Sequence, residues 1–439
     1  MDIEFIKAFQ KIEGQDVYIF ADVLDFTNEN SNPKVVVKSN GIGFEIPIPK
    51  NRKELYYFCG AIQNILCNPN ILVISWDIKN FISYVLAKTG KPMPFGKVLD
   101  LKILEFYLGT SENLKPPETF AEAHARLKAI VTDKNWEELR PIYTRVYHPL
   151  ITKVIPDIET VGLIHRRRQK RVFSHYDIAG QINGRMKCSE SLQESFNPHS
   201  MGKDEKKHSN PPNADEVLIC LDYKHMEVSV LQWLSGDPLL GKILDSGEDC
   251  YKGIWKELTS LEGTDQSRRM CKEFFLPVMF GMGARSLSEK IGIHHDVAVK
   301  LHDRIYSKFS VATSWLAKQK ELVKNDIAED IFGRRRTIPL TEQYKIRNFV
   351  IQSPAALFCL SKLVQLHKAL PQGKARLGFH IHDGYVLYTR KNERQQMAKL
   401  AIDVLEREDS LFPNLKLKVS CETGTNLIDL IKEEHERNN

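Results

Sequence analysis

The sequence has no Cys-x-x-Cys pair among its eight cysteines, which argues against a zinc ribbon. No apolar run is as long as a membrane span, and the N-terminus lacks the pattern of a secretory signal peptide. Internal repeats and low-complexity tracts are also absent. We therefore expect a cytoplasmic protein with reduced cysteines and no membrane partner.

A strong excess of charge of one sign is missing too. The net charge is +6 and the isoelectric point is near 8.7. This mildly basic balance permits a polyanionic partner but does not require one. The 439 residues are enough for about two or three domains with hydrophobic cores.

Residues 1–112 have the pattern of a separate α/β unit. Short runs rich in β-branched and aromatic residues predict strands, as in VYIFADVLDF and NILVISWD. Apolar spacing predicts helices, as in ELYYFCGAIQNIL and DLKILEFYL. The dipeptide Asn40-Gly41 marks a hairpin between two further strands. Strands that alternate with helices favour an α/β sheet.

The following segments are expected to differ in character. Residues 113–160 carry apolar residues at helical spacing and should be mostly helical. The basic cluster 165–171 is either a solvated turn or a contact for phosphate groups. Residues 195–215, rich in Asn, Pro, Lys and Ser, predict a long surface loop.

Two aspartates stand at the ends of predicted strands. Val217–Leu221 lead into Asp222, and Asp383 lies in a His-Asp-Gly turn that predicts a hairpin. Taken singly, Asp222 could cap a helix and Asp383 could be only a turn residue. If the hairpin tip lies beside Asp222, the two carboxylates could hold two divalent ions, which activate a hydroxyl and stabilise a leaving pyrophosphate. Oxygen ligands suit magnesium.

A basic stripe is predicted on one helix. Arg268, Lys272, Leu276 and Phe280 recur every four residues and therefore share one helical face. Two cations followed by an aromatic ring suit a nucleoside triphosphate. An amphipathic helix with a solvated basic end explains the same pattern. Pro277 has no amide hydrogen and should kink this helix.

Amide side chains follow a turn rich in arginine. Gly333–Arg336 precede Asn348 and Gln352, which lie one helical turn apart. Buried amides can bind the minor-groove acceptors that every base pair presents. A helix cap or a surface amide is the alternative for each.

The order and spacing of these segments resemble the family A DNA polymerases, the class of bacterial DNA polymerase I, over roughly residues 160–439. The family's motif A, Asp-Tyr-Ser-Gln-Ile-Glu-Leu-Arg, corresponds to DYKHMEVS. Motif B, Arg-Arg-x-x-Lys-x-x-x-Phe-Gly-x-x-Tyr-Gly, corresponds to RRMCKEFFLPVMFG, and motif C, Val-His-Asp-Glu, to IHDG. Upstream, INGRMKCSESLQESFN is similar to the family's Thr-Gly-Arg segment.

The resemblance implies a multidomain architecture of α+β and α/β type. A right-hand polymerase with palm, fingers and a shortened thumb would follow an RNase H-like, exonuclease-type α/β domain. The expected limits are 1–112 for the exonuclease-like domain, 113–160 for the helical thumb and 161–439 for palm and fingers, with the fingers at about 237–330.

The resemblance also implies a template-directed DNA polymerase that adds deoxynucleotides to a primer 3′ end by two-metal-ion nucleotidyl transfer. Two Mg²⁺ ions, or Mn²⁺, would be held by Asp222, Asp383 and the carbonyl of Tyr223. The incoming deoxynucleoside triphosphate would contact Arg268, Lys272, Tyr223, Glu227 and Phe280. Glu227 would exclude a ribose 2′-hydroxyl and pair with Phe280. Primer-template DNA would contact Arg185, Asn348, Gln352 and His382.

Several positions depart from the family pattern. Those in the motifs are Ser229 for an arginine, Leu276 for the aromatic that stacks on the base, Pro277 for a glycine, Phe280 for a tyrosine and Gly384 for a glutamate. The family's Asp-x-His appears as Asp249-Cys250-Tyr251. Both metal carboxylates are kept, so we expect catalysis to survive with altered speed and fidelity.

The N-terminal unit resembles the family's 3′–5′ exonuclease domain in a degenerate form. Asp22 is kept and Asp100 matches a later helix, but Leu24 and Phe81 stand where the family has carboxylates. A two-metal nuclease without those carboxylates cannot hold its ions, so we expect no proofreading. The short thumb predicts low processivity unless a partner compensates.

Two other functions fit parts of the pattern. A single-subunit RNA polymerase shares the two aspartates and the fingers lysine, although Glu227 argues against ribonucleotides. A non-catalytic DNA-binding relative would have no need of the metal carboxylates. Replication, gap-filling repair and lesion bypass all stay open. The compact chain favours a phage or mobile element as source, which would place it in the cytoplasm of a bacterial host.

Overall fold

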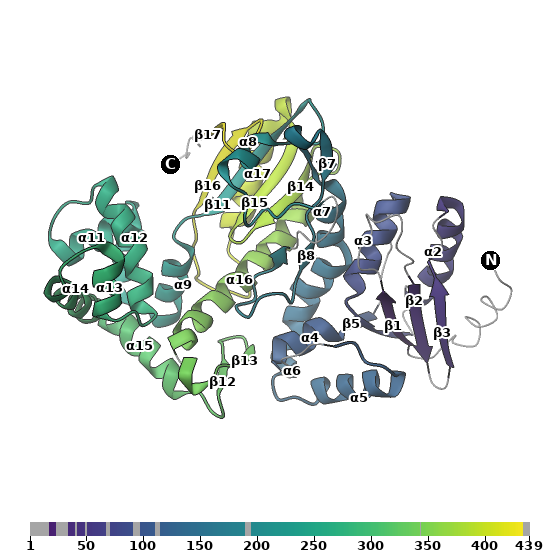
Figure 1. Cartoon of the computed structure of the whole chain (residues 1–439), viewed down its shortest axis with the longest axis horizontal. Coiled ribbons are helices and arrows are strands. Elements are labelled where there is room, and N and C mark those ends of the chain that lie inside the picture. The colour runs from purple at the N-terminus through teal and green to yellow at the C-terminus, as the bar shows by residue number, and fades with distance from the viewer. Residues whose placement is uncertain are drawn as a thin grey trace. The chain divides into compact units, whose positions relative to one another are not determined.

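The computed structural model describes residues 17–22, 34–39, 42–48, 51–66, 71–90, 97–109, 115–188, 195–342 and 344–432. The chain folds into two compact units (Figure 1). Unit 1 comprises Met1–Asp222, Cys359–Leu405 and Ser420–Asn439, and unit 2 comprises Tyr223–Phe358 and Glu406–Val419. These units cut across the domain limits expected from the sequence, which stay a prediction.

The first part of unit 1 is a five-stranded sheet. Its strands are β1 (Val17–Asp22), β2 (Lys34–Ser39), β3 (Ile42–Pro47), β4 (Leu72–Trp76) and β5 (Lys97–Asp100), in the order β3-β2-β1-β4-β5. β1, β4 and β5 are parallel, while β1, β2 and β3 form an antiparallel meander. The helices are α2 (Arg52–Leu66), α3 (Ile78–Thr89) and α4 (Leu101–Leu108). The predicted strands and helices are confirmed, but Asn40 and Gly41 lie outside the described residues.

A helical stretch follows the sheet, as the apolar spacing predicts. It consists of α5 (Phe120–Val131), α6 (Trp136–Ile142) and α7 (Ile155–Val161), with two π-helical turns between α6 and α7, Tyr143–Tyr147 and Leu150–Val154. Pro141 and Pro149 lie in this run. A proline supplies no amide hydrogen, so nearby carbonyls bond further along the helix and the turns widen.

The segment from 163 to 210 corrects one sequence expectation. Strands β6 (Leu163–His165) and β7 (Lys170–Val172) pair with β10 (Ser209–Asn210), and α8 (Lys203–His208) precedes β10. The prediction of a long surface loop over 195–215 is therefore wrong for 203–210. Acidic residues in the first turn of α8 and basic residues in the last stabilise it through the helix dipole. β8 (Tyr176–Asp177) and β9 (Lys187–Cys188) form a separate pair.

The second sheet of unit 1 carries both predicted catalytic aspartates. Its strands run in the order β14-β15-β11-β16-β17, with β14 (Ala375–Ile381), β15 (Gly384–Arg390), β11 (Glu216–Tyr223), β16 (Val419–Gly424) and β17 (Leu430–Lys432). The central strand β11 is buried along most of its length, which explains its apolar sequence VLICL. Helices α16 (Tyr344–Ala369) and α17 (Arg394–Glu406) complete this region of the chain.

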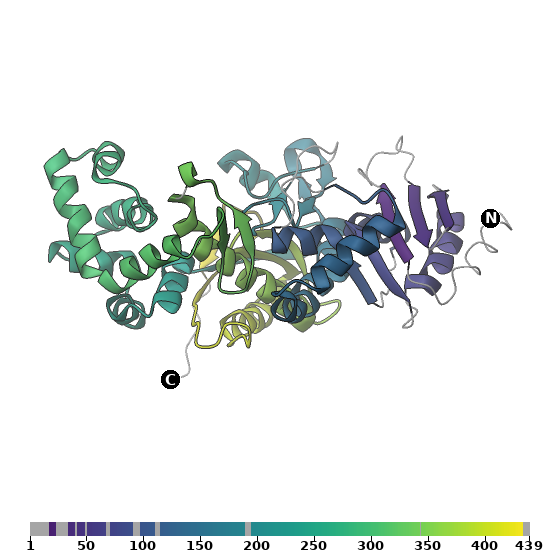
Figure 2. The ribbon, with the colours of Figure 1, turned by 90° about the horizontal axis from the view of Figure 1, so that it is seen from below.

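Unit 2 is mainly helical. It contains α9 (Met226–Ser235), α10 (Pro238–Asp245), α11 (Cys250–Thr259), α12 (Asp265–Met279), α13 (Ala284–Ile291), α14 (His295–Lys308) and α15 (Ser310–Glu321). Both ribbon views show α11 to α14 as one group of helices (Figures 1 and 2). The hairpin of β12 (Ile327–Glu329) and β13 (Arg335–Thr337) follows. Phe412 packs its ring against Phe332 and Phe358, with centroids 4.8 and 5.1 Å away, in the core of this unit.

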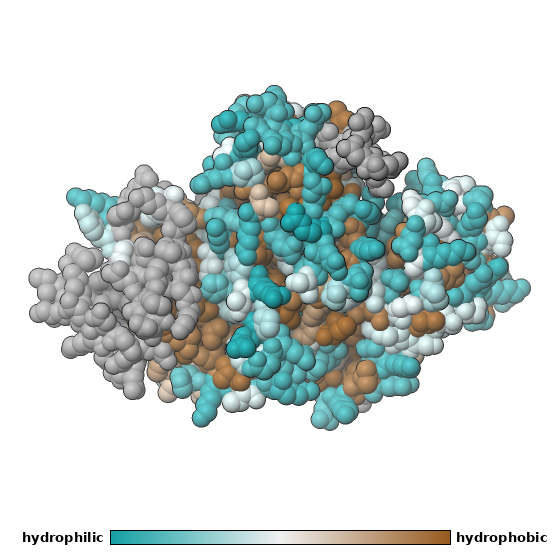
Figure 3. Space-filling model, turned by 180° about the vertical axis from the view of Figure 1, so that it is seen from behind, coloured by the Kyte–Doolittle hydropathy of each residue, from teal (hydrophilic) through white to brown (hydrophobic). Residues whose placement is uncertain are grey.

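One helix among the described residues, α16, is long and apolar enough to span a membrane. Its most apolar window is 89% buried inside the protein, as in the core helix of a globular fold. On the face shown in Figure 3, hydrophilic side chains cover much of the surface between smaller apolar patches. α16 is accordingly a core helix.

Candidate active site

The two predicted catalytic aspartates lie on neighbouring strands. β11 pairs with β15 so that Asp222 is opposite Gly384. Ile381 of β14 pairs with Gly384 of β15, which leaves His382 and Asp383 as a two-residue turn. The predicted hairpin is confirmed, and its turn stands at the end of β11 where Asp222 is exposed and Asp383 is half-buried. The fold therefore brings both carboxylates to one edge of the sheet.

Gly384 leaves space beside the Asp222 carboxylate. A Cβ atom at this glycine would lie 3.5 Å from Asp222 Oδ1 and 3.3 Å from the carbonyl oxygens of Leu221 and Ile381. The three atoms nearest to this position are oxygens, the ligands that hard divalent cations prefer. The described residues contain no group of three or more His, Cys, Asp or Glu side chains gathered as a metal site. Two carboxylates with backbone and substrate oxygens are the donor set that fits here.

His382 adopts a left-handed backbone conformation, with φ of 52°. Few residues other than glycine adopt it, and His is among those that do so more often. Its ring contacts that of His199 in a tilted arrangement, with centroids 4.3 Å apart and an interplanar angle of 32°. This contact restrains the direction of the His382 side chain at the turn.

Two further imidazoles of this region are held neutral. Burial, and to a smaller extent the charges of His382 and Arg185, lower the pKa of His199 to about 4. Burial, His199, His382 and Arg185 lower the pKa of His380 to about 3. Arg185 therefore lies close enough to the hairpin to act on both rings. No sequence pattern indicated His199, which belongs to the segment expected to be a loop.

In unit 2, the predicted phosphate-binding helix is α12. Thr264 caps it, with its side chain accepting from Ser267 N and the Ser267 side chain accepting from Thr264 N. Arg268 is half-buried, and its Nε lies 2.6 Å from Asp249 Oδ2. Lys272, one turn further, is exposed. The cationic face predicted from the spacing is present, with Arg268 engaged by a carboxylate.

Asp249 was noted in the sequence only as part of a departure from the family pattern. It accepts from Tyr251 N and Lys252 N at the start of α11, at 3.1 and 3.2 Å. Burial alone would raise the pKa of its carboxyl, but the hydrogen bond and charge of Arg268 lower it overall. Asp249 thus stays ionised and orients Arg268.

At the C-terminal end of α12, the residues of the predicted stripe do not all lie on an exposed face. The helix continues past Pro277 to Met279, and Phe280 is the half-buried C-terminal cap. Leu276 is only 9% exposed and belongs to the core of unit 2. The kink expected at Pro277 stays a prediction, as does a contact between Phe280 and Glu227.

Glu227 lies in the first turn of α9 and is half-buried. Burial, then the neighbouring Cys250 and Glu227, raise the pKa of Tyr251. Glu227 is therefore near the Tyr251 phenol at the start of α11. Tyr223, the last residue of β11, is buried and packs its ring on Phe358 with centroids 5.4 Å apart.

Asn348 and Gln352 are half-buried on α16, one turn apart as predicted. The next residue, Ser353, donates from Oγ to Asp330 Oδ2 at 2.5 Å. Asp330 Oδ1 also accepts from Arg334 N at 3.0 Å. The arginine-rich turn is thereby joined to the helix that carries the two amides, and Arg334 itself is buried.

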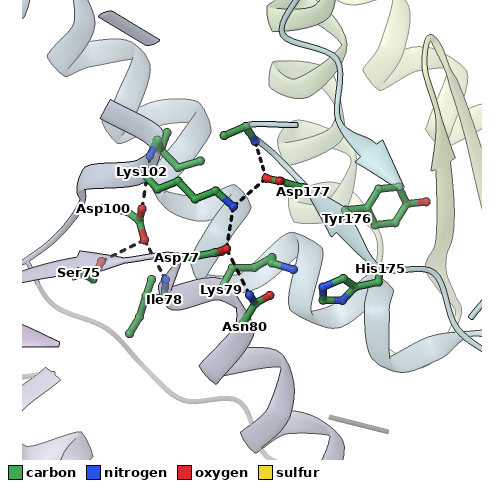
Figure 4. Close-up of polar contacts among 12 residues, drawn as sticks. Ser75, Asp77, Ile78, Lys79, Asn80, Asp100, Lys102, His175, Tyr176 and Asp177 are labelled. Carbon is green, nitrogen blue, oxygen red and sulfur yellow. Dashed lines mark hydrogen bonds and ion pairs between the residues drawn. The ribbon is translucent and has the colours of Figure 1, made fainter. Parts of the chain in front are cut away.

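The carboxyl ends of the parallel strands in the N-terminal sheet carry aspartates that are already engaged (Figure 4). Lys102 Nζ lies 2.8 Å from Asp77 Oδ2 and 3.0 Å from Asp177 Oδ1. Asp100 is buried and accepts from Ile78 N at 2.9 Å and from Ser75 Oγ at 3.1 Å. These aspartates make internal contacts of the fold.

Of the other positions named for the exonuclease-like site, the structure describes the side chain of Phe81, which is no carboxylate. Phe81 is fully buried and packs edge-on against Phe58, with centroids 6.5 Å apart. Asp22 ends β1, but its side chain and Leu24 lie outside the described residues. Burial would raise the pKa of Asp77, yet the charges of Lys102 and Lys79 lower it.

Known proteins resemble this chain over most of its length. The model of DNA polymerase family A matches residues 115–429. The thermostable DNA polymerase I of Thermus thermophilus is 26% identical over 300 residues, 63% of this chain and 36% of that protein. DNA polymerase I of Chloroflexus aurantiacus is 25% identical over 318 residues, 67% of this chain and 33% of that protein. The chain thus spans about a third of the length of these relatives.

The fold has a counterpart among solved structures. The POL domain of Pol1 from M. smegmatis, in a complex with DNA primer-template and dNTP, superimposes with a TM-score of 0.75 at 13% identity. The match covers 96% of this chain and 98% of that one. At this identity the likeness shows the fold alone, and it confirms the mixed helix-and-sheet architecture expected from the motifs.

Proposed function

Because this chain belongs to DNA polymerase family A, we propose that it adds deoxynucleotides to the 3′ end of a primer annealed to a DNA template. One observation carries the proposal. Asp222 is paired opposite Gly384, and the turn that contains Asp383 directly precedes Gly384, so the two aspartates lie at the same end of neighbouring strands. Paired carboxylates of this kind are what nucleotidyl transfer by metal ions requires.

Members of this family generally use divalent metal ions. In this chain Asp222, Asp383 and the carbonyl of Tyr223 would hold two Mg²⁺ ions, with Mn²⁺ as a substitute. When bound, such ions supply charge stabilisation for the triphosphate and favour the ionised primer hydroxyl. The oxygen atoms of Asp222, Leu221 and Ile381 nearest to Gly384 support this role.

Arg268 and Lys272 bind the triphosphate of the incoming nucleotide. Arg268 is held by Asp249, so the triphosphate has to take the place of that carboxylate or share the guanidinium with it. Phe280 contacts the base, and Tyr223 and Glu227 border the sugar. Glu227, a half-buried acid, excludes a ribose 2′-hydroxyl by occupying its volume and by the cost of desolvating both groups.

Primer and template contact Arg185, Asn348, Gln352 and His382. The ring of His382 contacts that of His199. Gln352 directly precedes Ser353, whose side chain is hydrogen-bonded to Asp330. Both residues therefore stand on backbone that neighbouring contacts restrain. Amide and imidazole groups on restrained backbone lose less conformational freedom when they bind the primer end and the minor groove.

The N-terminal sheet is a degenerate exonuclease-like domain that does not proofread. This proposal is supported by the engagement of Asp77 with Lys102 and of Asp100 with backbone and Ser75, which leaves neither carboxylate available to a metal pair. The enzyme works in the cytoplasm, in a bacterial host if a phage or plasmid encodes it. Replication, repair and lesion bypass are the biological roles open to it.

A primer-extension assay tests the function directly. Wild-type protein is expected to extend a primer on a template with Mg²⁺ or Mn²⁺, and Asp383→Asn to reduce the rate by at least about 10³-fold, since several kcal/mol of charge stabilisation is lost. Binding of the same DNA, followed by fluorescence anisotropy, should persist. Asp403→Asn, an exposed aspartate paired with Lys399, is the matched control and should extend normally.

Two outcomes would replace the proposal by its alternatives. A wild-type protein that binds DNA but adds no nucleotide with either metal is a non-catalytic relative. Efficient addition of ribonucleotides would instead favour an activity like that of single-subunit RNA polymerases.

A further inference from the structure

We propose that the N-terminal sheet region, residues 17–108, positions the hairpin that carries Asp383, through Glu159 and Tyr176. The inference rests on the proposed polymerase function and adds to it a positioning role for the N-terminal sheet region. The link consists of buried polar contacts within unit 1. It starts at helix α3, passes through α7 and β8, and ends on β14.

The first part of the link is Glu159 on α7, a fully buried carboxylate. Lys79 Nζ lies 2.8 Å from Glu159 Oε1, and Ser83 Oγ donates to Oε2 at 2.6 Å. Both partners come from α3. A buried charge is tolerated only when it is paired and hydrogen-bonded, so α3 and α7 are bound to each other at this point.

The same carboxylate holds β8. Tyr176 N donates to Glu159 Oε1 at 2.8 Å, and His175 Nδ1 lies 3.4 Å from that oxygen. On the other side of Tyr176, Asp177 is bound by Lys102 from α4 at 3.0 Å. Tyr176 is therefore held by Glu159 through its own amide, and the N-terminal region holds the next residue, Asp177, directly through Lys102.

The side chain of Tyr176 leads away from these contacts. Figure 4 shows Lys102 between Asp77 and Asp177, with the Tyr176 ring directed away from that group. The ring is fully buried, and its hydroxyl donates to His380 O and accepts from His380 N, both at 3.0 Å. One hydroxyl thus satisfies both backbone groups of a residue three positions before Asp383.

The position of β14 in its sheet explains why the contact with Tyr176 stabilises it. It is the edge strand of its sheet in the described part of the chain, and its pairing with β15 is irregular between Leu377 and Phe379. The open edge of such a strand has no ladder partner for residues that face outward. Tyr176 takes the place of that partner at His380, just before the tight turn of His382 and Asp383. Small displacements of a catalytic group reduce a rate strongly, so this contact matters for Asp383.

The test compares two tyrosines that make the same kind of contact. Tyr143 is also buried, and its hydroxyl accepts from Asp100 N at 2.8 Å and donates to Val98 O at 3.2 Å, but on β5, away from the hairpin. Tyr176→Phe should lower kcat for single-nucleotide addition by about 10- to 100-fold with little change in the KM for the nucleotide. Tyr143→Phe should leave kcat and KM unchanged, although both variants lose comparable thermal stability.

A second pair of variants tests the N-terminal end of the link. Lys79→Met should reduce kcat in the same way, and Lys79→Arg should restore it because the charge is kept. The double variant Lys79→Met with Tyr176→Phe should be no slower than the worse single variant, since both act through one chain of contacts. If Lys79→Met does not fold, the comparison of the two tyrosines decides alone.

The results separate the inference from the function on which it rests. A wild-type enzyme that extends primers, with Tyr176→Phe equal to it or no slower than Tyr143→Phe, overturns the inference and leaves the polymerase function intact. A wild-type protein that adds no nucleotide overturns both.

Discussion

Gly384 is the residue whose missing side chain matters most at the candidate active site. Replacing it with alanine would push a Cβ to 3.3 Å from two paired backbone carbonyls and 3.5 Å from Asp222 Oδ1. We expect Gly384→Ala to destabilise the fold by about 1–3 kcal/mol and to slow extension about tenfold or more, because the carbonyl groups of Leu221 and Ile381 have to shift and Leu221 directly precedes Asp222. Thermal unfolding and single-nucleotide kinetics measure the two effects.

Gly241→Ala is the control for this substitution. Its Cβ would also come within 3.3 Å of a neighbour, but that neighbour is the flexible end of Gln232. It should extend primers as wild type does. Equal activity of Gly384→Ala and wild type would show that the space beside Asp222 has no role.

Glu227 gives a second test at this scale. Glu227→Ala should remove the exclusion of the 2′-hydroxyl and reduce the selectivity for deoxynucleotides over ribonucleotides by about 10²-fold. The measurement is kcat/KM for matched pairs of nucleotides. Glu262→Ala, an exposed acid paired with Lys256 in the same unit, should leave selectivity unchanged. If Glu227→Ala discriminated between deoxynucleotides and ribonucleotides as well as the wild type does, another residue would have to exclude the 2′-hydroxyl.

Single residues were predictable where a motif kept its spacing. Asp222 and Asp383 were found because a strand end and an Asp-Gly hairpin leave local patterns. The partner of Arg268 was not recognised, because Asp249 lies 19 residues earlier and only the folded chain brings them together. Tyr176 and His380, which are 204 residues apart, are further beyond any local pattern.

Among the helices, the contact of α3 with α7 gives the clearest energetic expectation. Lys79→Met leaves Glu159 buried without its cation, which should reduce the free energy of unfolding by about 3–5 kcal/mol. Urea denaturation measures it. Arg140→Ala removes an exposed pair with Glu137 and should change stability by less than about 1 kcal/mol. If Lys79→Met had only a small effect on stability, the hydrogen bonds from Ser83 and the Tyr176 amide would be sufficient to stabilise the buried Glu159 carboxylate.

The secondary structure itself was largely predictable. Apolar patterns located α2, α4, α5 and the strands β1, β4, β11, β14 and β15, because those segments bury one face or both. They did not locate β5, β16 or β17. They also failed for α8 and β10, where the sequence is polar and the structure is fixed by pairing with β6, far away in the chain. The two π-helical turns could not be predicted either, because apolar residues at three- and four-residue spacing indicate a helix without showing where one of its turns widens.

Acid should weaken the molecule as a whole within a defined range. The folded protein holds the pKa of His199 at about 4, below its ordinary value of 6.5. Between these values the unfolded chain binds more protons, so stability is lost as the pH falls from about 6.5 towards 4. His380, with a pKa of about 3, adds to the loss in the same direction.

Melting temperatures across this pH range test the expectation. The slope of Tm against pH should be smaller in His199→Gln, which cannot be protonated. His294→Gln, an exposed histidine, should keep the slope of the wild type. A slope unaffected by His199→Gln would contradict the assignment.

The resemblance predicts a shortened thumb at 113–160, which gives an expectation for the whole enzyme on DNA. With such a thumb, we expect short products when a trap DNA captures dissociated enzyme. Nor should a mismatched 3′ end be excised. Long products from single binding events would contradict the first expectation, and metal-dependent release of the mismatched nucleotide the second.

The π-helical turns at Tyr143–Tyr147 and Leu150–Val154 have a consequence for how this chain can evolve. Each such turn holds one residue more than an α-helical turn, so it is where a helix can absorb an insertion. One residue corresponds to about 100° of rotation around the helix axis. Deleting one residue here would turn Glu159 away from Lys79 and Ser83. The fold therefore depends on the number of residues in this stretch, whereas a surface loop tolerates a change of length at little cost.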